Sequence, residues 1–593
     1  MSGFLSKLAA GVEAIGEGLA DTVALREDST GIHPCPALLY EWDHTSVSPL
    51  AMVKFPPPCD FPSLNWALAT AETILESQAN AFEIEASAET RQEIEGHMTL
   101  LREGVRKREV SIPLLETIVH GAATFAVVKG AADRPRSIDE YNQLFRLIAL
   151  PPIAKDYSSD DTFAHHRTAG PNPLMIRRIR TMPENFPLPD AQFRQVLPDD
   201  SLAAALAEGR AYLCDYEMLA DIVVDPTYLP VKYHYAPIAL FAAHKTTGAL
   251  IPVAIQTQQK PDGRNTFLAD GTPNWMIAKT IVQMADTNVH QAVSHLGRTH
   301  FLIEPFIVAT ARTLGREHCV SRLLWPHFEG TLMINYLSGR TLISPGGGVE
   351  QLLMGKLSST TRMTANQLLN YPINQAFQPL TFAARDVGDL KDYAYRDDSL
   401  LYWKAIGDWV KEYVELFYSD NAKVQADVAI QSWCTELVSN SGGRVVGFGE
   451  SGGIQTRDYL IQALTMIIFT SSVQHAAVNF PQLDLMTYAP NMPGACYGQF
   501  PKAGPATEQD YLDMLPPLHR AAIQMQITYQ LGSNHYTELG QYPANYFSGV
   551  GSEMLRRFQT AVADAGTTIT ARNRVRPPYR TLEAGQIPQS INV

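Results

Sequence analysis

The segment 275–314 constrains the fold of this chain more than any other. Its apolar residues recur at steps of three and four, which is the period of an α-helix. The polar side chains that enter this apolar pattern include His290, Gln291, His295 and His300. A buried imidazole costs free energy unless its ring nitrogens find partners. The chain must therefore fold around this helix so that several histidines are satisfied at once.

The spacing of His295 and His300 predicts a local distortion of this helix. The two histidines are five residues apart, which on an ideal α-helix separates their directions by about 140°. Both rings can face one point only if the helix is locally underwound. A π-helical turn has that effect, and such turns occur frequently at functional sites. We therefore expect a π-helical segment between these residues.

A second polar pair, His475 and Asn479, lies far downstream. Its spacing of four puts both side chains on one face of an undistorted helix. The sequence ends at Val593 without a polar tail. Three imidazoles, one amide oxygen and a terminal carboxylate would complete the coordination of one transition-metal ion. Thiolates are absent from this set, which disfavours a structural zinc site. Histidines with oxygen donors favour non-haem iron or manganese.

The composition is that of a globular protein, with 45% hydrophobic and 18% charged residues among 593. Helical patterns dominate residues 63–150 and the chain from 273 onward. Short strand-like pieces lie at 211–215 and 237–257. No internal repeat or long linker interrupts the chain, and the candidate ligands span its second half. We predict one large, mainly α-helical domain with a few short strands.

Charge and cysteine usage favour a cytoplasmic protein that does not bind nucleic acid. The formal net charge is −14, whereas binding to a phosphate backbone needs clustered Lys and Arg. The six cysteines are scattered without a CxxC motif, which predicts reduced thiols. Residues 3–25 are amphipathic and could lie on a membrane surface or dock on the protein's own core. Their acidic polar face favours docking on the core.

Several runs of the sequence resemble the lipoxygenase family. The resemblance covers the chain from about residue 135 to the end, and its motifs are long and specific. It implies a mainly α-helical lipoxygenase catalytic domain over residues 135–593. Residues 1–134 would then form a helical, proline-rich extension packed on that core. They lack the strand pattern of the lipid-binding β-barrel that begins plant and animal members, which suggests a compact microbial form. The runs are 163–164 (FA), 167–173 (RTAGPNP), 290–306 (HQAVSHLGRTHFLIEPF), 324–328 (LWPHF), 334–335 (IN), 475–482 (HAAVNFPQ) and 587–593 (IPQSINV).

The resemblance implies a ligand set of His295, His300, His475, Asn479 and the Val593 carboxylate. The usual last residue of the family is isoleucine, and the valine found here also ends members of its manganese-using branch. That branch spaces its first two histidines more closely than this chain does. We therefore expect iron, with manganese as the alternative.

The resemblance also assigns residues outside the ligand set. His290 falls next to the metal ligands rather than among them. Gln291 and Gln482 match a glutamine pair that links the metal surroundings to the substrate cavity. This assignment is physically reasonable, because ligating imidazoles and amides need outer partners to hold their orientation.

Substrate specificity is expected to reside in residues 334–349. Ser338 falls where the family carries alanine or glycine, a position that helps decide which end of the pentadiene oxygen attacks. Serine is closer in bulk to alanine, which favours S stereochemistry. Leu342 and Val349 are expected to line the same cavity, although each could equally be an ordinary core residue.

The implied reaction is dioxygenation of a polyunsaturated fatty acid with a cis,cis-pentadiene, such as linoleate or arachidonate. A metal(III)-hydroxide would take a hydrogen atom from the bis-allylic carbon, and molecular oxygen would add to give a hydroperoxide. The fatty acid and O2 are then the expected partners. Two alternatives are a hydroperoxide isomerase-type lipoxygenase and a non-catalytic lipid-binding relative. The intact ligand set speaks against the second.

Overall fold

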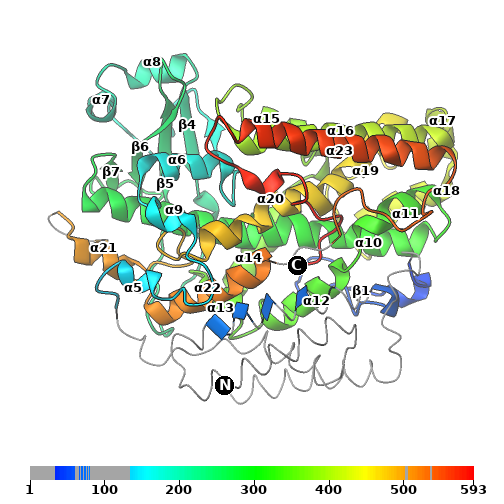
Figure 1. The fold of residues 1–593 in the computed structure, drawn as a ribbon, viewed down its shortest axis with the longest axis horizontal. Helices are drawn as coiled ribbons and strands as arrows, with labels where there is room; N and C mark the ends of the chain where they lie inside the picture. Colours follow the sequence, from blue (N-terminus) through cyan, green and yellow to red (C-terminus); the bar gives the residue numbers. More distant parts are fainter. Residues whose placement is uncertain are drawn as a thin grey trace.

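The computed structural model describes residues 34–60, 134–500, 505–533 and 537–593, with scattered residues from 66 to 80. The expected helix at 3–25 and most of the expected extension over 1–134 lie outside the described residues. Within the described part, helices fill most of the molecule, which confirms the mainly α-helical class (Figure 1).

One continuous helical run crosses the middle of the molecule (Figure 1). It consists of α9, the π-helical segment η5 (His290–Phe301) and α10. Thr272 caps its start, because the Thr272 side chain accepts a hydrogen bond from the Trp275 amide. The helices up to this run and just after it are α5 (Asp139–Asn142), α6 (Asp160–Ala169), α7 (Asp190–Val196), α8 (Leu202–Ala207), α9 (Pro273–Val289), α10 (Leu302–Thr313), α11 (Cys319–Leu324), α12 (Thr331–Thr341), α13 (Gly348–Leu352) and α14 (Leu357–Leu369).

A second long run, Arg457–Met486, contains α19, η8 (Thr470–Gln474), α20 and η9 (Gln482–Met486). It is the one helical stretch in the described part of the chain that is long and apolar enough to cross a membrane. Most of it is buried inside the protein, so packing in the core accounts for its apolar composition. The later helices are α15 (Gln378–Ala384), α16 (Ala394–Phe417), α17 (Asn421–Ala426), α18 (Val428–Val438), α19 (Arg457–Phe469), α20 (His475–Asn479), α21 (Glu508–Met514), α22 (Leu518–Ser533) and α23 (Val550–Arg572).

An antiparallel sheet of five strands lies at one end of the molecule (Figure 1). Its strands pair in chain order, and it includes the strands expected at 211–215 and 237–257. Phe193 of α7 and Leu202 of α8 are buried against one face of it, so the sheet has a small core of its own. The strands are β3 (Arg177–Arg178), β4 (Ala211–Asp215), β5 (Ile238–Ala243), β6 (Leu250–Gln256) and β7 (Thr266–Leu268).

A short N-terminal hairpin, β1 (Trp42–Asp43) and β2 (Met52–Val53), lies within a disulfide-closed loop. Cys35 and Cys59 form that disulfide. The prediction that all six cysteines are reduced thiols is therefore wrong for this pair. The spacing of 24 residues matches no cysteine motif, and only the fold of the loop brings the two sulfurs together.

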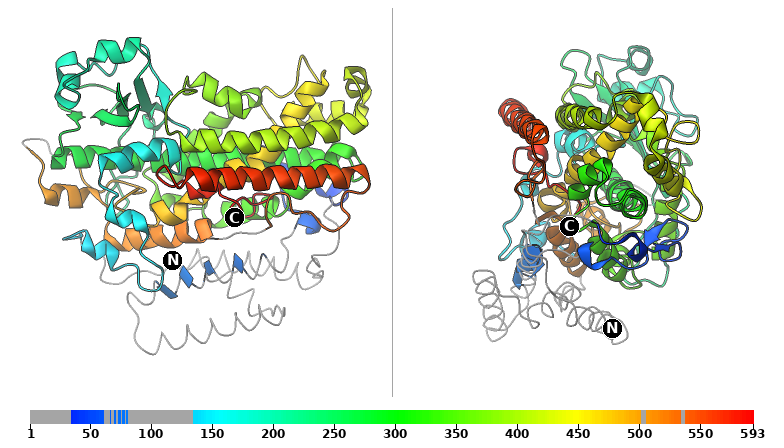
Figure 2. Two further views of the ribbon diagram at one scale, coloured as in Figure 1. Left: turned by 45° about the horizontal axis from the view of Figure 1, so that its top comes forward. Right: turned by 90° about the vertical axis from the view of Figure 1, so that its right-hand side faces the viewer.

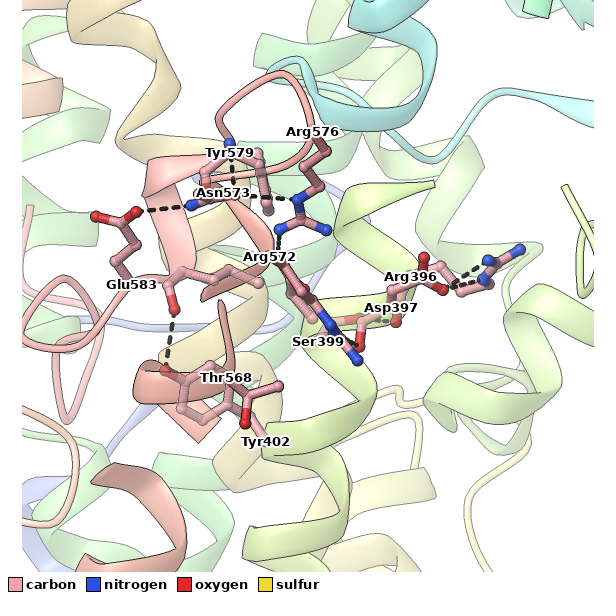
Figure 3. A network of polar contacts seen from close by, with 12 residues as sticks. Arg396, Asp397, Ser399, Tyr402, Thr568, Arg572, Asn573, Arg576, Tyr579 and Glu583 are labelled. Carbon is pink, nitrogen blue, oxygen red and sulfur yellow. Dashed lines mark hydrogen bonds and ion pairs between the residues drawn. The ribbon is translucent and has the colours of Figure 1, made fainter. Parts of the chain in front are cut away.

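The C-terminal helix α23 packs along α16 (Figures 1 and 2). The fully buried carboxylate of Asp398 on α16 holds its end, because Arg572 donates to it at 2.7 Å and Arg576 pairs with its other oxygen. Figure 3 shows this network and its extension, in which Tyr402 donates to the carbonyl of Leu582 at 2.9 Å. These contacts hold residues 572–582, which lead from the end of α23 to the C-terminal tail.

Those last residues run back into the centre of the molecule (Figure 1). The carbonyl of Gln589 lies 2.9 Å from His327 Nδ1, and the carbonyl of Ile591 accepts from Thr331 at 2.8 Å. Gly330 has a φ of +79°, and a Cβ there would lie 3.3 Å from Asn592 Cβ. Glycine therefore lets the tail pass close to the start of α12.

Candidate metal centre

The two long core helices bring three imidazoles to one point. His295 Nε2 lies 3.3 Å from His475 Nε2 and 3.2 Å from His300 Nε2. All three side chains are buried. Two imidazole nitrogens that each lie about 2.1 Å from one ion, at right angles, are about 3 Å apart. The spacing of the three nitrogens therefore fits ligands of a shared metal ion.

The protonation state of these rings also fits metal binding. Burial lowers the pKa of His300 to about 4, partly offset by a hydrogen bond to Asn335. Burial holds the pKa values of His295 and His475 well below their ordinary value. The pKa of His295 is lowered further by the three neighbouring histidines, and that of His475 by His300. The rings are therefore neutral and carry lone pairs, which a cation can accept. His475 Nδ1 is buried without a hydrogen-bond partner among the described residues, and its Nε2 faces His295 Nε2 at 3.3 Å.

The expected π-helical distortion is present and is confirmed over His290–Phe301. It puts His295 and His300 on one face in spite of their spacing of five. Pro305 contributes to the change in helical pitch, because it cannot donate the i→i−4 hydrogen bond to the carbonyl of Phe301, where the π-helical segment ends.

A chain of hydrogen bonds orients His300. Its Nδ1 lies 2.8 Å from Asn335 Oδ1, and the Asn335 amide donates to Glu304 at 2.7 Å. The other carboxylate oxygen of Glu304 accepts from the Val53 amide at 2.6 Å. Asn335 thereby selects the tautomer with the proton on Nδ1 and the lone pair on Nε2. Glu304 and Asn335 thus connect the N-terminal hairpin to the candidate ligand His300 by hydrogen bonds.

Our sequence prediction missed the roles of Asn335 and Glu304. A glutamate in a helix is most often a solvent-facing residue. Here Glu304 is fully buried. Burial raises its pKa, the hydrogen bonds from the Val53 and Asn335 N–H groups offset part of that rise, and the resulting pKa is about 7. The signal that could have revealed it is its position four residues after His300, on the strongly apolar start of α10.

The amide of Asn479 is held from both sides. Its Nδ2 donates to the carbonyl of Leu531 at 2.8 Å, and its Oδ1 accepts from Gln482 Nε2 at 2.9 Å. Gln291 Nε2 donates to Gln482 Oε1 at 2.6 Å. The structure thus joins the two glutamines directly and ties them to Asn479. One lone pair of Asn479 Oδ1 is left for a metal ion.

His290 stands next to the three-histidine cluster and outside it. Its Nε2 lies 2.5 Å from the carbonyl of Val478, and its ring stacks on that of His295 at a centroid distance of 5.8 Å. Burial lowers the pKa of His290 to about 4. The ring is therefore a neutral side chain that links the two core helices.

Val593, at the end of the tail, is 5% exposed. The preceding carbonyl, that of Asn592, accepts a hydrogen bond from the indole of Trp66. Ser590 donates to the carbonyl of Glu329 at 2.8 Å. These bonds hold the tail at the start of α12, which also carries Asn335.

Of the three residues expected in the substrate cavity, Ser338 lies on α12, Leu342 directly follows that helix, and Val349 lies on α13. Asn335, Ser338 and Leu342 are spaced three and four apart, so they share a face. Leu342 and Val349 pack in an apolar cluster with Leu352, Leu353, Ile523, Ile527 and Leu531. The carbonyl of Leu531 is also the acceptor for Asn479. The apolar cluster therefore reaches the candidate ligand Asn479 through Leu531, and Ser338 lies one helical turn before its member Leu342.

The fold and this set of donors define a class, the non-haem metal proteins with a histidine centre on core helices. The chain belongs to the lipoxygenase family, whose model matches residues 138–589. It is 34% identical to the linoleate 9/13-lipoxygenase of Pseudomonas aeruginosa, over 94% of this chain and 89% of that protein. It is 32% identical to the polyunsaturated fatty acid lipoxygenase ALOX8 of Mus musculus, over 80% of this chain and 72% of that protein.

Solved structures show the same fold. The coral 8R-lipoxygenase superposes with a TM-score of 0.79 at 27% identity, covering 94% of this chain and 79% of that one. A calcium-dependent 11R-lipoxygenase gives a TM-score of 0.74 at 30% identity, covering 78% and 70% of the two chains. The expected family and catalytic-domain fold are thereby confirmed, and the chain is an oxidoreductase of the dioxygenase type.

Proposed function

We propose that this protein is a non-haem iron dioxygenase that converts fatty acids with a cis,cis-pentadiene into hydroperoxides. The observation that carries the proposal is the convergence of His295, His300 and His475, whose Nε2 atoms lie 3.2–3.3 Å apart in successive pairs. The names of the bacterial and mouse relatives, which specify linoleate and polyunsaturated fatty acids, support the substrate class.

The proposed ligands are the three imidazoles, the Asn479 amide oxygen and the Val593 carboxylate. When bound, the metal supplies the one-electron oxidation of the bis-allylic C–H group. Nitrogen and oxygen donors suit iron and manganese alike, and the wider spacing of the first two histidines leads us to propose iron. Within the protein, Asn335 holds His300 and Gln482 holds Asn479 in the orientation that coordination needs.

The apolar cluster around Leu342 and Val349 would hold the pentadiene and exclude water. A hydrocarbon chain has no polar group to satisfy, so a wall of aliphatic side chains next to the metal is the matching surface. Excluding water also protects a radical from side reactions. The chemistry needs no carboxylate or histidine as a general base.

Ser338 is proposed to control where oxygen attacks, because it lies between Asn335 and Leu342 on one face of α12. Chiral chromatography of the products of Ser338→Gly tests this role. A change in the oxygenated position or configuration is expected. Unchanged products would remove Ser338 from the specificity-determining set.

The proposed reaction is tested by incubating the purified protein with linoleate, with and without oxygen. Conjugated-diene absorbance and oxygen uptake in equal amounts are expected. The chain is also 29% identical to the human hydroperoxide isomerase ALOXE3, over 79% of this chain and 67% of that protein. Consumption of a preformed hydroperoxide without oxygen uptake would assign the isomerase activity instead. Lipid binding without either reaction would mark a non-catalytic relative.

The cytoplasmic location and the membrane contact through residues 3–25 stay predictions. The disulfide between Cys35 and Cys59 removes the argument from reduced thiols, since disulfides persist mainly in oxidising compartments. Fractionation of the source cells, with the protein detected in each fraction, measures its location directly.

A further inference from the structure

A cavity of about 200 Å³ is lined by residues of both helical runs that carry the histidine cluster. Arg298 of η5 and Gln474 of η8 line it, together with Arg385, Tyr371, Leu302 and Phe469. Arg298 lies between His295 and His300 in the sequence, and Gln474 directly precedes His475. The cavity is therefore built from the same two helical runs as the metal centre.

The cavity contains two guanidinium groups and no carboxylate among its described lining residues. A guanidinium is charged at any physiological pH. Neither Arg298 nor Arg385 takes part in an ion pair within the described chain, unlike the fully buried Arg167, which pairs with Asp286 at 3.1 Å. The like charges of Arg298 and Arg385 repel one another. Two uncompensated cations at one cavity are costly unless an anion joins them.

Both arginines are held in place by other contacts. Arg385 donates to the carbonyls of Thr381, Pro173 and Ile176 and to the Tyr393 hydroxyl. Arg298 stacks on Tyr371, with its guanidinium carbon 4.3 Å from the ring centroid. Fixed guanidinium groups lose little conformational entropy when they bind a ligand, so the cavity is pre-organised.

Three donor nitrogens of the cavity residues have no acceptor in the described part of the chain. Arg298 Nε, Arg385 Nη2 and Gln474 Nε2 are buried and have no hydrogen-bond partner among the described residues. The Gln474 side chain is 8% exposed, and its Oε1 already accepts from Tyr395. A buried donor without a partner is rare in native proteins, and three around one cavity indicate a missing acceptor.

We propose that this cavity binds a compact oxyanion, either a carboxylate or a phosphate. Such a ligand brings at least two acceptor oxygens and one negative charge, which match the unpaired donors and the two cations. Water could fill the space but could not balance the charge. The bound anion would brace η5 against η8, and so hold together the helices that carry His295, His300 and His475.

The test is isothermal titration calorimetry of the metal-loaded protein with inorganic phosphate and, separately, with succinate. Saturable binding of one anion per chain is expected, accompanied by a rise in the melting temperature. Arg298→Gln should weaken binding at least about tenfold, because it removes one charged donor pair. Arg316→Gln removes an exposed arginine and should leave the affinity unchanged.

A second variant, Gln474→Met, keeps the side-chain length and removes the unpaired donor, so it serves if Arg298→Gln does not fold. Tighter binding of phosphate would identify the natural ligand as a phosphate, and tighter binding of succinate would identify it as a carboxylate. Absence of saturable binding to the wild-type protein would overturn the proposal. So would binding that neither Arg298→Gln nor Gln474→Met weakens, because the anion would then sit elsewhere, for example on the metal. Fatty-acid oxygenation tests the proposed function separately, so the two can fail independently.

Discussion

Nδ1 of His300 lies 2.8 Å from Oδ1 of Asn335, and the same asparagine donates to Glu304 at 2.7 Å. The buried amide of Asn335 thus accepts a hydrogen bond from a candidate ligand, His300, and donates one to the buried carboxylate of Glu304. The helix that carries Asn335, α12, also carries Ser338, for which we propose a role in the substrate cavity.

Replacement of Asn335 by alanine should weaken metal binding. The His300 ring loses its acceptor, and Glu304 loses a donor while remaining buried. Loss of such an outer partner typically lowers metal affinity or activity about 10- to 100-fold. Metal retained after dialysis against a graded series of chelator concentrations measures the effect. Asn366→Ala, on α14, removes an asparagine outside this chain of hydrogen bonds, and its metal content should match that of the wild type.

Gly348→Ala should alter the substrate cavity. A Cβ at this position would lie 2.8 Å from Leu342 Cδ2 and 3.1 Å from Ile527 Cδ1, so both side chains must move. We expect a lower kcat/KM with linoleate and a changed ratio of positional isomers. Gly339→Ala is the matched control, since nothing lies within 4 Å of its added Cβ. Equal kinetics and products for both variants would show that Leu342 does not line the cavity.

Lys232 should make the stability of the protein depend on pH. Its ammonium group donates to the carbonyls of Glu350 and Leu353, both at 2.7 Å, and burial lowers its pKa from 10.5 to about 7. Between pH 7 and about 10 the unfolded chain therefore binds more protons than the folded chain, so this group makes stability rise with pH, by at most about 1.4 kcal/mol per pH unit. In Lys232→Met the melting temperature should rise less between pH 7 and 9.

The matched control is Lys404→Met, whose side chain is 76% exposed. Its pH profile should follow that of the wild type. Identical profiles for Lys232→Met and the wild type would show that Lys232 does not titrate in this range.

Removal of the disulfide should destabilise the N-terminal hairpin. Closing a loop of 24 residues is worth about 3 kcal/mol in the chain-entropy model. Cys35→Ser/Cys59→Ser should therefore melt at a lower temperature and, through Val53 and Glu304, lose metal to chelators faster. Cys319→Ser, which removes a free thiol, should do neither. If the two cysteines of the untreated protein react with an alkylating agent, the bond is absent.

The sequence was sufficient for the main features of the fold and of the histidine cluster. The apolar period of 275–314 predicted the core helix, and the spacing of His295 and His300 predicted its π-helical segment, because both depend on local geometry. The pairing of Gln291 with Gln482 was expected only from the family resemblance.

Features that depend on long-range packing could not be predicted in this way. Glu304 meets Val53 across 251 residues of sequence, and Cys35 meets Cys59 without any motif. The position of Arg298 at the cavity, with a buried Nε, also depends on packing, whereas its sequence pattern is that of an ordinary charged residue of a helix. Nothing local distinguishes such a residue from a solvent-facing one, since the neighbours that remove its water come from other elements.

The central claim is that three histidines, Asn479 and the terminal carboxylate hold one iron ion. Metal analysis of the purified wild-type protein, beside a variant that lacks Val593, tests it most directly. About one iron atom per chain is predicted for the wild type. The shortened chain is predicted to keep its helical circular dichroism and to lose both iron and conjugated-diene formation from linoleate. Full iron content and full activity without Val593 would contradict the ligand set.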